Sequence, residues 1–416
     1  MRADTLDILR CPYCGGRLAL ATSQFHVLDG DDVVDGILGC HCCAFPVVSG
    51  IAVMHLQPAA AAALGHLDAG RPDRALHSLF ELDSESESAE RLTALVASAT
   101  STYRDVVDAL GSSFEGGYFL YRFSDPTFVV ARAVVESVAG AALRAGGRAV
   151  DICGGSGHLT RSLLAASSPP PVLADLHFSK TWLARRFTAP GCEAVACDGN
   201  SPMPFARGAF RYAMCSDAFM YIWTKRQFVQ EMLRLTDVGD ERWAVVINHT
   251  HNQLVWSPSH GQPLPPSGYR DLFETIEPRV FAERHLLADV VGGGPLDLGR
   301  HDDPASIDSD PALTLVASRD PAVFAKHPIA APAQARGEFR LNPLYEARPE
   351  GGGLRLRLRF PSDDYEQEYG ACRQYLPDDL VVDRATLGRL PATEASGALA
   401  GLARGRVILD LPKRYY

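Results

Sequence analysis

A glycine-rich segment is the strongest chemical feature of the chain. Residues 149–158 read AVDICGGSGH, so an apolar run ends in a turn that holds Gly154, Gly155 and Gly157. Glycine has no Cβ and lets the backbone approach a ligand closely. Residues 159–166 follow with a helical pattern, and a strand, a glycine-rich turn and a helix form the first unit of a doubly wound fold. This pattern predicts a ligand site at the turn.

Carboxylates recur after this turn. Asp151 lies in the first predicted strand, Asp175 ends the apolar run 172–175, Asp198 precedes Gly199 after a third strand, and Asp217 ends a fourth strand over 211–217. In open α/β sheets, ligands bind at the carboxyl ends of the strands. We therefore expect these acids to surround one site. The turn does not satisfy the G-x-G-x-x-G pattern of NAD-binding domains over residues 153–158.

The pattern of residues 118–320 resembles class I S-adenosylmethionine (SAM) methyltransferases. The resemblance implies that Gly155 and Gly157 lie near the methionine part of SAM, Asp175 on the ribose, and Asp198 with Gly199 near the adenine. The remaining expected cofactor contacts are Asp151, Gly154, Asp217 and Tyr121, the last from an aromatic segment before the core. One departure from the family is Cys153, which stands where the first glycine of the turn is usual.

Two histidines follow the fifth predicted strand, residues 243–248. The sequence NHTHN at 248–252 places His249 and His251 at the expected ligand edge. Histidine is the usual proton acceptor near neutral pH, so both are candidate catalytic bases for methyl transfer to oxygen or nitrogen. Two alternatives stay open: a hydrogen-bonded loop that closes the sheet, or a metal site, because residues two apart on a strand share a face.

Two C-x2-C pairs near the start of the chain predict a structural zinc site. Cys11 and Cys14 form the first pair, and Cys40 and Cys43 the second, with Cys42 as the nearest substitute ligand. Four thiolates converging from two knuckles suit tetrahedral Zn²⁺ and leave no open position for catalysis. Residues 6–16 (LDILRCPYCGG) and 46–51 (PVVSGI) resemble small zinc-ribbon proteins that activate tRNA methyltransferases. That resemblance implies a fused accessory module.

The predicted architecture is α/β: a Rossmann-like class I methyltransferase sheet with helices on both faces, a small N-terminal zinc ribbon and a C-terminal α+β extension. The expected divisions are the ribbon at 1–56, a helical linker or cap at 57–117, the methyltransferase domain at 118–320, and an extension of unknown role at 337–416. Residues 321–336 are rich in alanine and proline, as linkers are.

The composition of the chain limits the classes of function that we expect. The net charge is −10, whereas proteins that bind long nucleic acids usually present a basic face. We therefore expect a small-molecule acceptor, with nucleic acid unlikely. Neither an apolar run long enough for a membrane helix nor a signal peptide is visible, which favours a cytoplasmic protein. A homodimer is a further expectation. The alternative functions are methylation of RNA or of a translation factor, and a non-catalytic methyltransferase-fold scaffold.

Overall fold

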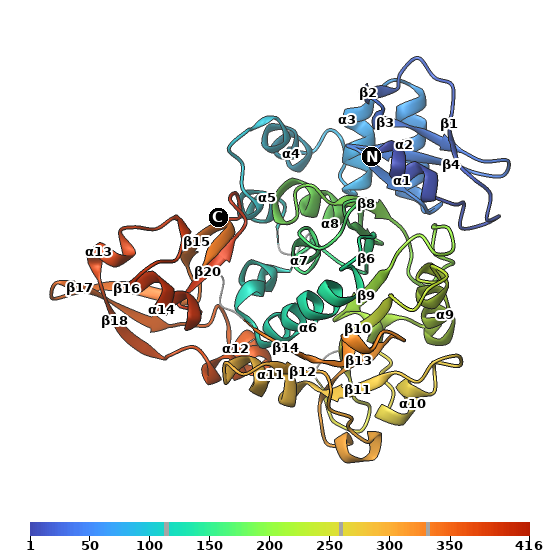
Figure 1. Ribbon diagram of the computed structural model, residues 1–416. Coiled ribbons are helices and arrows are strands. Elements are labelled where there is room, and N and C mark those ends of the chain that lie inside the picture. The colour runs from blue at the N-terminus through green and yellow to red at the C-terminus, as the bar shows by residue number, and fades with distance from the viewer. Residues whose placement is uncertain (112–115, 258–260, 330–332) are drawn as a thin grey trace.

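The computed structural model describes residues 1–111, 116–257, 261–329 and 333–416. Its centre is one sheet with the strand order β1-β3-β4-β5-β8-β7-β6-β9-β10-β13-β11 (Figure 1). Five strands of this sheet form a parallel core. Across the sheet they come in the order third, second, first, fourth and fifth, counted along the chain, which is the doubly wound Rossmann order. They are β8 (Glu193–Ala196), β7 (Val172–Asp175), β6 (Ala149–Ile152), β9 (Tyr212–Ser216) and β10 (Ala244–His251).

Beyond β10 the sheet ends in a mixed edge. Strand β13 (Ala312–Ala317) runs antiparallel to β10, and β11 (Arg279–Ala282) runs antiparallel to β13. The sequence predicted that the fifth strand ends at Asn248. The structure extends β10 to His251 through a register shift between Ile247 and Thr250, so the two histidines belong to the end of the strand itself.

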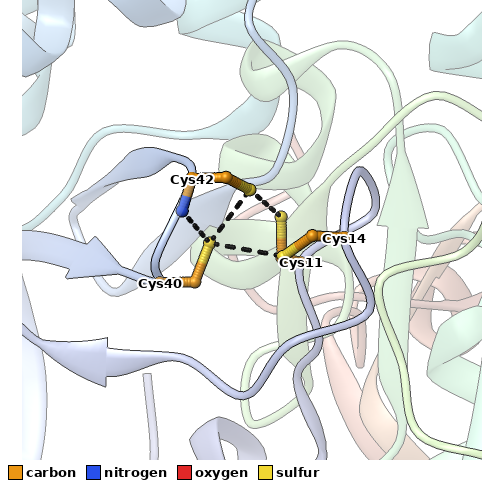
Figure 2. A group of neighbouring side chains, drawn as sticks. All are labelled: Cys11, Cys14, Cys40 and Cys42. Carbon is orange, nitrogen blue, oxygen red and sulfur yellow. Dashed lines mark hydrogen bonds between the residues drawn. The ribbon is translucent and has the colours of Figure 1, made fainter.

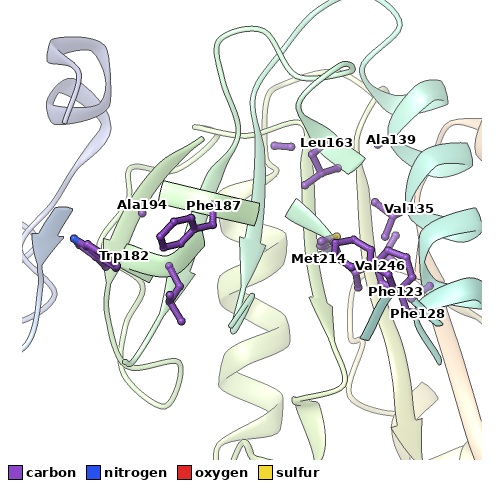
Figure 3. Close-up of a cluster of buried hydrophobic side chains, with 14 of the residues drawn as sticks. Phe123, Phe128, Val135, Ala139, Leu163, Trp182, Phe187, Ala194, Met214 and Val246 are labelled. Carbon is purple, nitrogen blue, oxygen red and sulfur yellow. The ribbon is translucent and has the colours of Figure 1, made fainter. Parts of the chain in front are cut away.

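The central strands are apolar because both of their faces are covered. All four residues of β6, β7 and β8 are buried. Ala149, Met214 and Val246 face one hydrophobic cluster, and their neighbours Val150 and Cys215 face another. Figure 3 shows part of the first cluster, where side chains of the central strands meet Phe128, Val135 and Ala139. The predicted two-faced α/β sheet is confirmed.

Two sets of helices cover these faces. The first cluster takes side chains from the long helix α6 (Pro126–Ala142), from α8 (Phe178–Leu183), and from α11 (Glu283–Val291). The second takes them from α9 (Lys225–Leu235) and α10 (Pro266–Arg270). Helix α6 begins at Pro126, because the Asp125 carboxylate accepts a hydrogen bond from the backbone N–H of Phe128 and proline is favoured in the first turn. The helix after the glycine turn, α7, is short: Thr160–Leu163.

The N-terminal segment continues the core sheet. Its strands are β1 (Ala19–Leu20), β2 (Val27–Asp29), β3 (Asp32–Gly39), β4 (Ala44–Val48) and β5 (Ile51–Val53), with helix α1 (Ala3–Ile8) before them. Strand β5 pairs in parallel with β8 through Ala52 and Val195. Figure 1 shows this segment at the β8 end of the sheet. The cysteine-bearing segment is thereby fixed to the core by backbone hydrogen bonds.

In the described part of the chain, helices and three small sheets lie outside the main sheet, and the smallest of these sheets pairs β12 (Leu296–Asp297) with β14 (Lys326–His327). The segment between the ribbon and the core contains α2 (Pro58–Asp68), α3 (Pro72–Leu79), α4 (Glu87–Ala97) and α5 (Tyr103–Leu110), followed by the 3-10 segment η1 (Gly117–Ser124). The C-terminal part forms two three-stranded antiparallel sheets. Their strands are β15 (Gln334–Leu341), β16 (Tyr345–Glu350), β17 (Gly353–Leu358), β18 (Asp379–Asp383), β19 (Ala392–Glu394) and β20 (Ile408–Leu411).

A buried ion pair joins this C-terminal part to the core. The Arg161 guanidinium donates to the Asp410 carboxylate at 2.7 Å, and both side chains are almost fully buried. Among the helices that the structure describes, none has the length and apolar character needed to cross a membrane.

Candidate active site

A cavity of about 350 Å³ lies at the carboxyl ends of β6, β7, β8 and β9. The predicted cofactor residues that line it are Asp151, Gly154, Gly155, Asp175, Asp198, Gly199 and Asp217. A larger hollow of about 650 Å³ lies elsewhere, lined by residues such as Arg207, Asp237 and Asp240. We place the site in the smaller cavity, because ligands of open α/β sheets bind at the carboxyl ends of the strands.

The turn after β6 forms the floor of this cavity. Cys153 and Gly155 both adopt the left-handed conformation, with φ of 60° and 54°. A Cβ on Gly154 would lie only 2.7 Å from Cγ of Asp151. The turn therefore accepts Cys153 in place of the usual first glycine, but the position of Gly154 needs a residue without a side chain.

Asp151 presents an unsatisfied carboxylate oxygen at the cavity. Its Oδ2 accepts a 2.6 Å hydrogen bond from the Thr160 hydroxyl, whereas Oδ1 has no hydrogen-bond partner among the described residues. Burial raises the pKa of Asp151 to about 7, against the opposing effect of the Thr160 hydrogen bond. A buried acceptor of this kind requires a donor from a ligand or water.

Asp175 is held in one orientation at the end of β7. Its Oδ2 accepts from the backbone N–H of Gly155 at 2.9 Å, and its Oδ1 accepts from the backbone N–H of His177 at 2.9 Å. Burial works to raise the pKa of this carboxyl, but the hydrogen bonds from His177 outweigh burial and lower it. Asp175 thus remains a carboxylate and ties the second strand to the glycine turn.

The third strand supplies Asp198 and Gly199. Oδ1 of Asp198 accepts from the backbone N–H of Asn200 at 2.9 Å, and the Asn200 side chain accepts from the backbone N–H of Trp223 at 2.7 Å. A Cβ on Gly199 would lie 3.2 Å from Sγ of Cys153. This part of the wall is therefore close to the glycine turn.

Asp217 links the cavity to the segment that covers it. The buried Arg122 guanidinium lies 3.0 Å from Oδ2 of Asp217 and 3.2 Å from Oδ2 of Asp125. Burial works against the charge of Arg122, but the two carboxylates raise its pKa. The Arg122 side chain also lines the cavity.

The two predicted catalytic histidines lie beside Asp217 but do not line the cavity. Nδ1 of His249 lies 2.7 Å from Oε2 of Glu283, and its Nε2 lies 4.0 Å from Oδ1 of Asp217. Burial opposes protonation of His249, but the carboxylates of Glu283 and Asp217 outweigh burial and raise its pKa to about 9. For His251, burial and the neighbouring His249 lower the pKa.

Two predicted cofactor residues lie outside the cavity. Tyr121 points to the C-terminal part, where its ring packs edge-on against Tyr365 with centroids 5.7 Å apart, and it borders a separate groove. Tyr118 and Phe119 of the same segment line the cavity instead. In the 3-10 segment η1, side chains three apart share a face, and Tyr118 and Tyr121 both pack against rings of the C-terminal part; of the two, Tyr118 is the one that also reaches the cavity. Gly157 packs under the turn, where a Cβ would lie 2.7 Å from Cβ of Ala184.

The C-terminal end of the chain supports this cover. His158 lines the cavity and is buried, and its Nε2 lies 2.7 Å from the hydroxyl of Tyr415. Burial, and then the nearby Arg122 charge, lower the pKa of His158 to about 3, so its imidazole is neutral. The Tyr415 hydroxyl also donates to the carbonyl of Phe119 at 2.6 Å.

Sequence reasoning missed several residues of the site. Lys180, His177 and Asn200 line the cavity, and each follows a predicted strand closely enough that the strand-end rule could have included it. Glu283 had no such signal. It is far from His249 along the chain, and only the fold brings the two together.

The N-terminal cysteines form a compact group (Figure 2). It comprises Cys11, Cys14, Cys40 and Cys42, whose sulfur atoms all lie within 4.8 Å of one another. Three Sγ–Sγ distances are 3.8, 3.7 and 3.5 Å. Four thiolates at about 2.3 Å from a tetrahedral Zn²⁺ would lie ~3.8 Å apart, so the group fits zinc. The structure differs from the expected ligand set in one position, since it gathers Cys42 in place of Cys43.

The charges of the cavity define the ligand that it can hold. Four carboxylates line it, and the cationic side chains are Arg122 and Lys180, of which Arg122 is paired within the protein. The wall therefore favours a ligand that carries positive charge and several hydrogen-bond donors. SAM has a sulfonium, an ammonium, a ribose diol and an adenine amino group, so the residues present fit it. A polyanion would meet repulsion at the same wall.

Comparisons with known proteins find structural but not sequence relatives. No protein-family model and no curated protein matches the sequence. A SAM-dependent methyltransferase from Thermotoga maritima is 12% identical over 46% of this chain and 91% of its own, with a TM-score of 0.30. Geranyl diphosphate C-methyltransferase from Streptomyces coelicolor, solved with Mg²⁺, a substrate analogue and S-adenosylhomocysteine, is 14% identical over 42% of this chain and 69% of its own, with a TM-score of 0.31.

A complex of the Haloferax volcanii Trm112 methyltransferase activator with a methyltransferase also matches, at 16% identity and a TM-score of 0.32, over 42% of this chain and 83% of that one. These solved structures are methyltransferase-fold neighbours of less than half of the chain.

Proposed function

We propose that the protein is a SAM-dependent methyltransferase whose acceptor is an oxygen or nitrogen atom of a small molecule. The observation that carries this proposal is the set of four carboxylates near the glycine turn: Asp151, Asp175, Asp198 and Asp217 lie at or just past the carboxyl ends of four neighbouring parallel strands and line one cavity. Such a wall complements a cationic cofactor. Bound SAM would supply an electrophilic methyl group.

The residues of the chain have distinct roles in this proposal. Asp175, fixed by two backbone N–H groups, accepts hydrogen bonds from the ribose diol. Asp151 offers its unsatisfied oxygen to the methionine ammonium group, and Gly154 leaves the space that the ligand needs. Tyr118, Phe119 and Arg122 cover the cavity and exclude water. The acceptor enters beside Asp217, and the two predicted catalytic histidines lie behind this residue. His251, whose pKa is lowered by burial, can accept the proton, whereas His249, whose pKa is raised to about 9, already carries one near neutral pH.

The rim of the site supports a small apolar acceptor. Tyr221 lines the cavity and has half of its surface exposed, and Trp223 next to Asn200 is 72% exposed. Exposed apolar groups near a concave polar site are typical of surfaces that bind a ligand. An RNA backbone would instead require basic side chains at this rim.

One observation supports a second candidate function. The segment that resembles methyltransferase activators is joined to the core sheet by pairing of β5 with β8. Activators of this kind accompany methyltransferases that act on RNA or translation factors, so a macromolecular acceptor is the alternative. The acidic cavity wall favours the small molecule.

Calorimetric titration tests the cofactor part of the proposal. SAM and S-adenosylhomocysteine are titrated into the zinc-loaded protein, into Asp175→Ala, and into Asp237→Ala as a control. Asp237 is an exposed acid outside the cavity, paired with Arg207. We expect binding to the wild type and the control and its loss in Asp175→Ala. Absence of binding by folded wild-type protein would favour the scaffold alternative. Transfer of a labelled methyl group to small molecules, compared with RNA, then separates the two acceptor classes.

A further inference from the structure

A second group of potential metal ligands lies next to the cofactor cavity. Among the described residues, Asp217, His249 and His251 offer ligand atoms that all lie within 4.8 Å of one another. The one other such group in the described part of the chain is the cysteine cluster. Two imidazoles and a carboxylate are a donor set suited to divalent first-row transition metals.

The fold brings these side chains together by a local departure from regular strand geometry. Asn248 and Ser216 are paired across β10 and β9, so the next residues, His249 and Asp217, lie side by side at the carboxyl ends. Both adopt the left-handed conformation, with φ of 49° and 55°. This conformation is uncommon for residues other than glycine and is concentrated at functional sites. It places Asp217 and His249 at the same edge as His251.

A second layer of contacts fixes the orientation of the ligands. Oε1 of Glu283 accepts from the backbone N–H of His249 at 2.8 Å and from the Thr314 hydroxyl at 2.9 Å, so Glu283 is itself held in place. Its Oε2 lies 2.7 Å from Nδ1 of His249, which leaves Nε2 directed toward Asp217. A carboxylate behind a histidine is the usual arrangement in metal sites, because it fixes the ring and makes the ligand nitrogen more basic.

The other two ligands are held in the same way. Nδ1 of His251 lies 3.2 Å from the Ser257 hydroxyl, so Nε2 is the nitrogen available to an ion. Arg122 binds Oδ2 of Asp217 at 3.0 Å, so Oδ1 is the oxygen that faces His249. Each side chain therefore presents one donor atom, and the three donors converge.

We propose that Asp217, His249 and His251 bind a divalent transition-metal cation, with Glu283 as a positioning residue. Three protein ligands leave open positions for water or for an oxygen of the acceptor. Two carboxylates flank the His249 ring: Glu283 lies at Nδ1 and Asp217 at Nε2, so an ion held by Nε2 and Asp217 would have a second carboxylate behind the ring.

The location of the ion defines what it would do. Because Asp217 lines the cavity, a cation beside it would lie at the wall where the acceptor enters. A hydroxyl bound to such a cation loses its proton more readily, which would favour acceptors with oxygen donors. This consequence rests on the proposed methyltransferase function, but metal binding itself does not.

Metal content after equilibration with Co²⁺ provides the test. Protein with its cysteine site loaded with zinc is titrated with Co²⁺, and bound cobalt and zinc are counted per chain by mass spectrometry. We expect the wild type to take up one cobalt ion that His251→Gln does not bind. His301→Gln, which removes an exposed histidine outside the group, serves as a matched control and should behave as the wild type. Glu283→Gln should bind cobalt ~10–100-fold more weakly.

The absorption spectrum of bound cobalt and a SAM-binding measurement distinguish the remaining outcomes. Cobalt in the proposed site should lack the thiolate charge-transfer band that cobalt in the cysteine cluster would show. SAM binding by His251→Gln shows whether this variant is folded, and Asp217→Asn provides a second variant if it is not. Cobalt uptake by the wild type without SAM binding would support the metal site and contradict the proposed function. Wild-type protein that binds no cobalt beyond the cysteine cluster would refute the metal site.

Discussion

Replacement of Asp151 by Asn should stabilise the protein and weaken cofactor binding, and the stabilisation should depend on pH. The Asp151 side chain is buried, and its Oδ1 has no hydrogen-bond partner among the described residues. Burial raises its pKa from 3.8 to about 7. An ionised carboxylate in this position is therefore destabilising unless a ligand supplies positive charge. Asparagine keeps an acceptor for Thr160 and removes the charge.

The magnitude follows from proton linkage. Below pH ~4, Asp151 is protonated in the folded and the unfolded chain, so wild type and Asp151→Asn should be similar in stability. As pH rises from ~4 to ~7, the unfolded chain loses its proton first, and the wild type loses stability relative to the variant. Above pH ~7 the difference reaches ~4 kcal/mol, because one pKa unit corresponds to about 1.4 kcal/mol.

Urea unfolding followed by tryptophan fluorescence, without cofactor, measures this difference. Between pH ~5.5 and ~8.5 the advantage of Asp151→Asn should grow by ~2 kcal/mol. Titration of the cysteines affects both proteins equally and cancels in the difference. Calorimetry at the higher pH should show weaker SAM binding by the variant. If the stability difference between Asp151→Asn and the wild type stays constant or shrinks as pH rises, burial does not raise the pKa of Asp151 and the reasoning is refuted.

Three further predictions concern the turn, the metal and the C-terminal part. Gly154→Ala should weaken SAM binding at least ~10-fold in a calorimetric titration, since the new Cβ would lie 2.7 Å from Cγ of Asp151. The control Gly140→Ala, in α6 with open space around it, should leave SAM binding unchanged. When zinc is counted by mass spectrometry, Cys42→Ser should have lost zinc and Cys43→Ser should have retained it. The opposite result would show that Cys43 is the fourth ligand, as the sequence predicted. Asp410→Asn should lower the free energy of unfolding by ~3–5 kcal/mol, because it leaves Arg161 buried without its partner. Asp379→Asn, in an exposed ion pair, should change the free energy of unfolding by less than ~1 kcal/mol. Equal effects of the two substitutions would contradict a stabilising role for the buried pair.

The strand-end residues show how far local sequence determined the site. Asp151, Asp175, Asp198 and Asp217 each follow or end a short apolar run, and the repeated strand–helix order implies a parallel sheet. Parallel strands have their carboxyl ends at one edge, so the prediction that these acids share a cavity is confirmed. The glycine turn was equally predictable, because left-handed and crowded positions restrict the residue types that can occupy them.

Other parts of the site depend on contacts between distant segments. No local pattern indicates that Glu283 orients His249, that Tyr415 binds His158, or that β5 extends the core sheet beside β8. Such contacts are set by which surfaces pack together, and a single sequence does not record them. The direction of Tyr121 away from the cavity was decided in the same way, by its packing against Tyr365.

The sequence by itself thus determined the α/β class, the four acids at one sheet edge, the glycine turn and a cysteine cluster, since each arises from short-range periodicity and steric demand. Only the tertiary structure decided which sulfur atoms converge, because Cys42 and Cys43 are adjacent and the turn between β3 and β4 selects one of them. Only the tertiary structure placed Asp217, His249 and His251 within reach of one cation. A register shift in β10 and two left-handed residues set that arrangement, and their energetic cost is met by packing of the whole sheet.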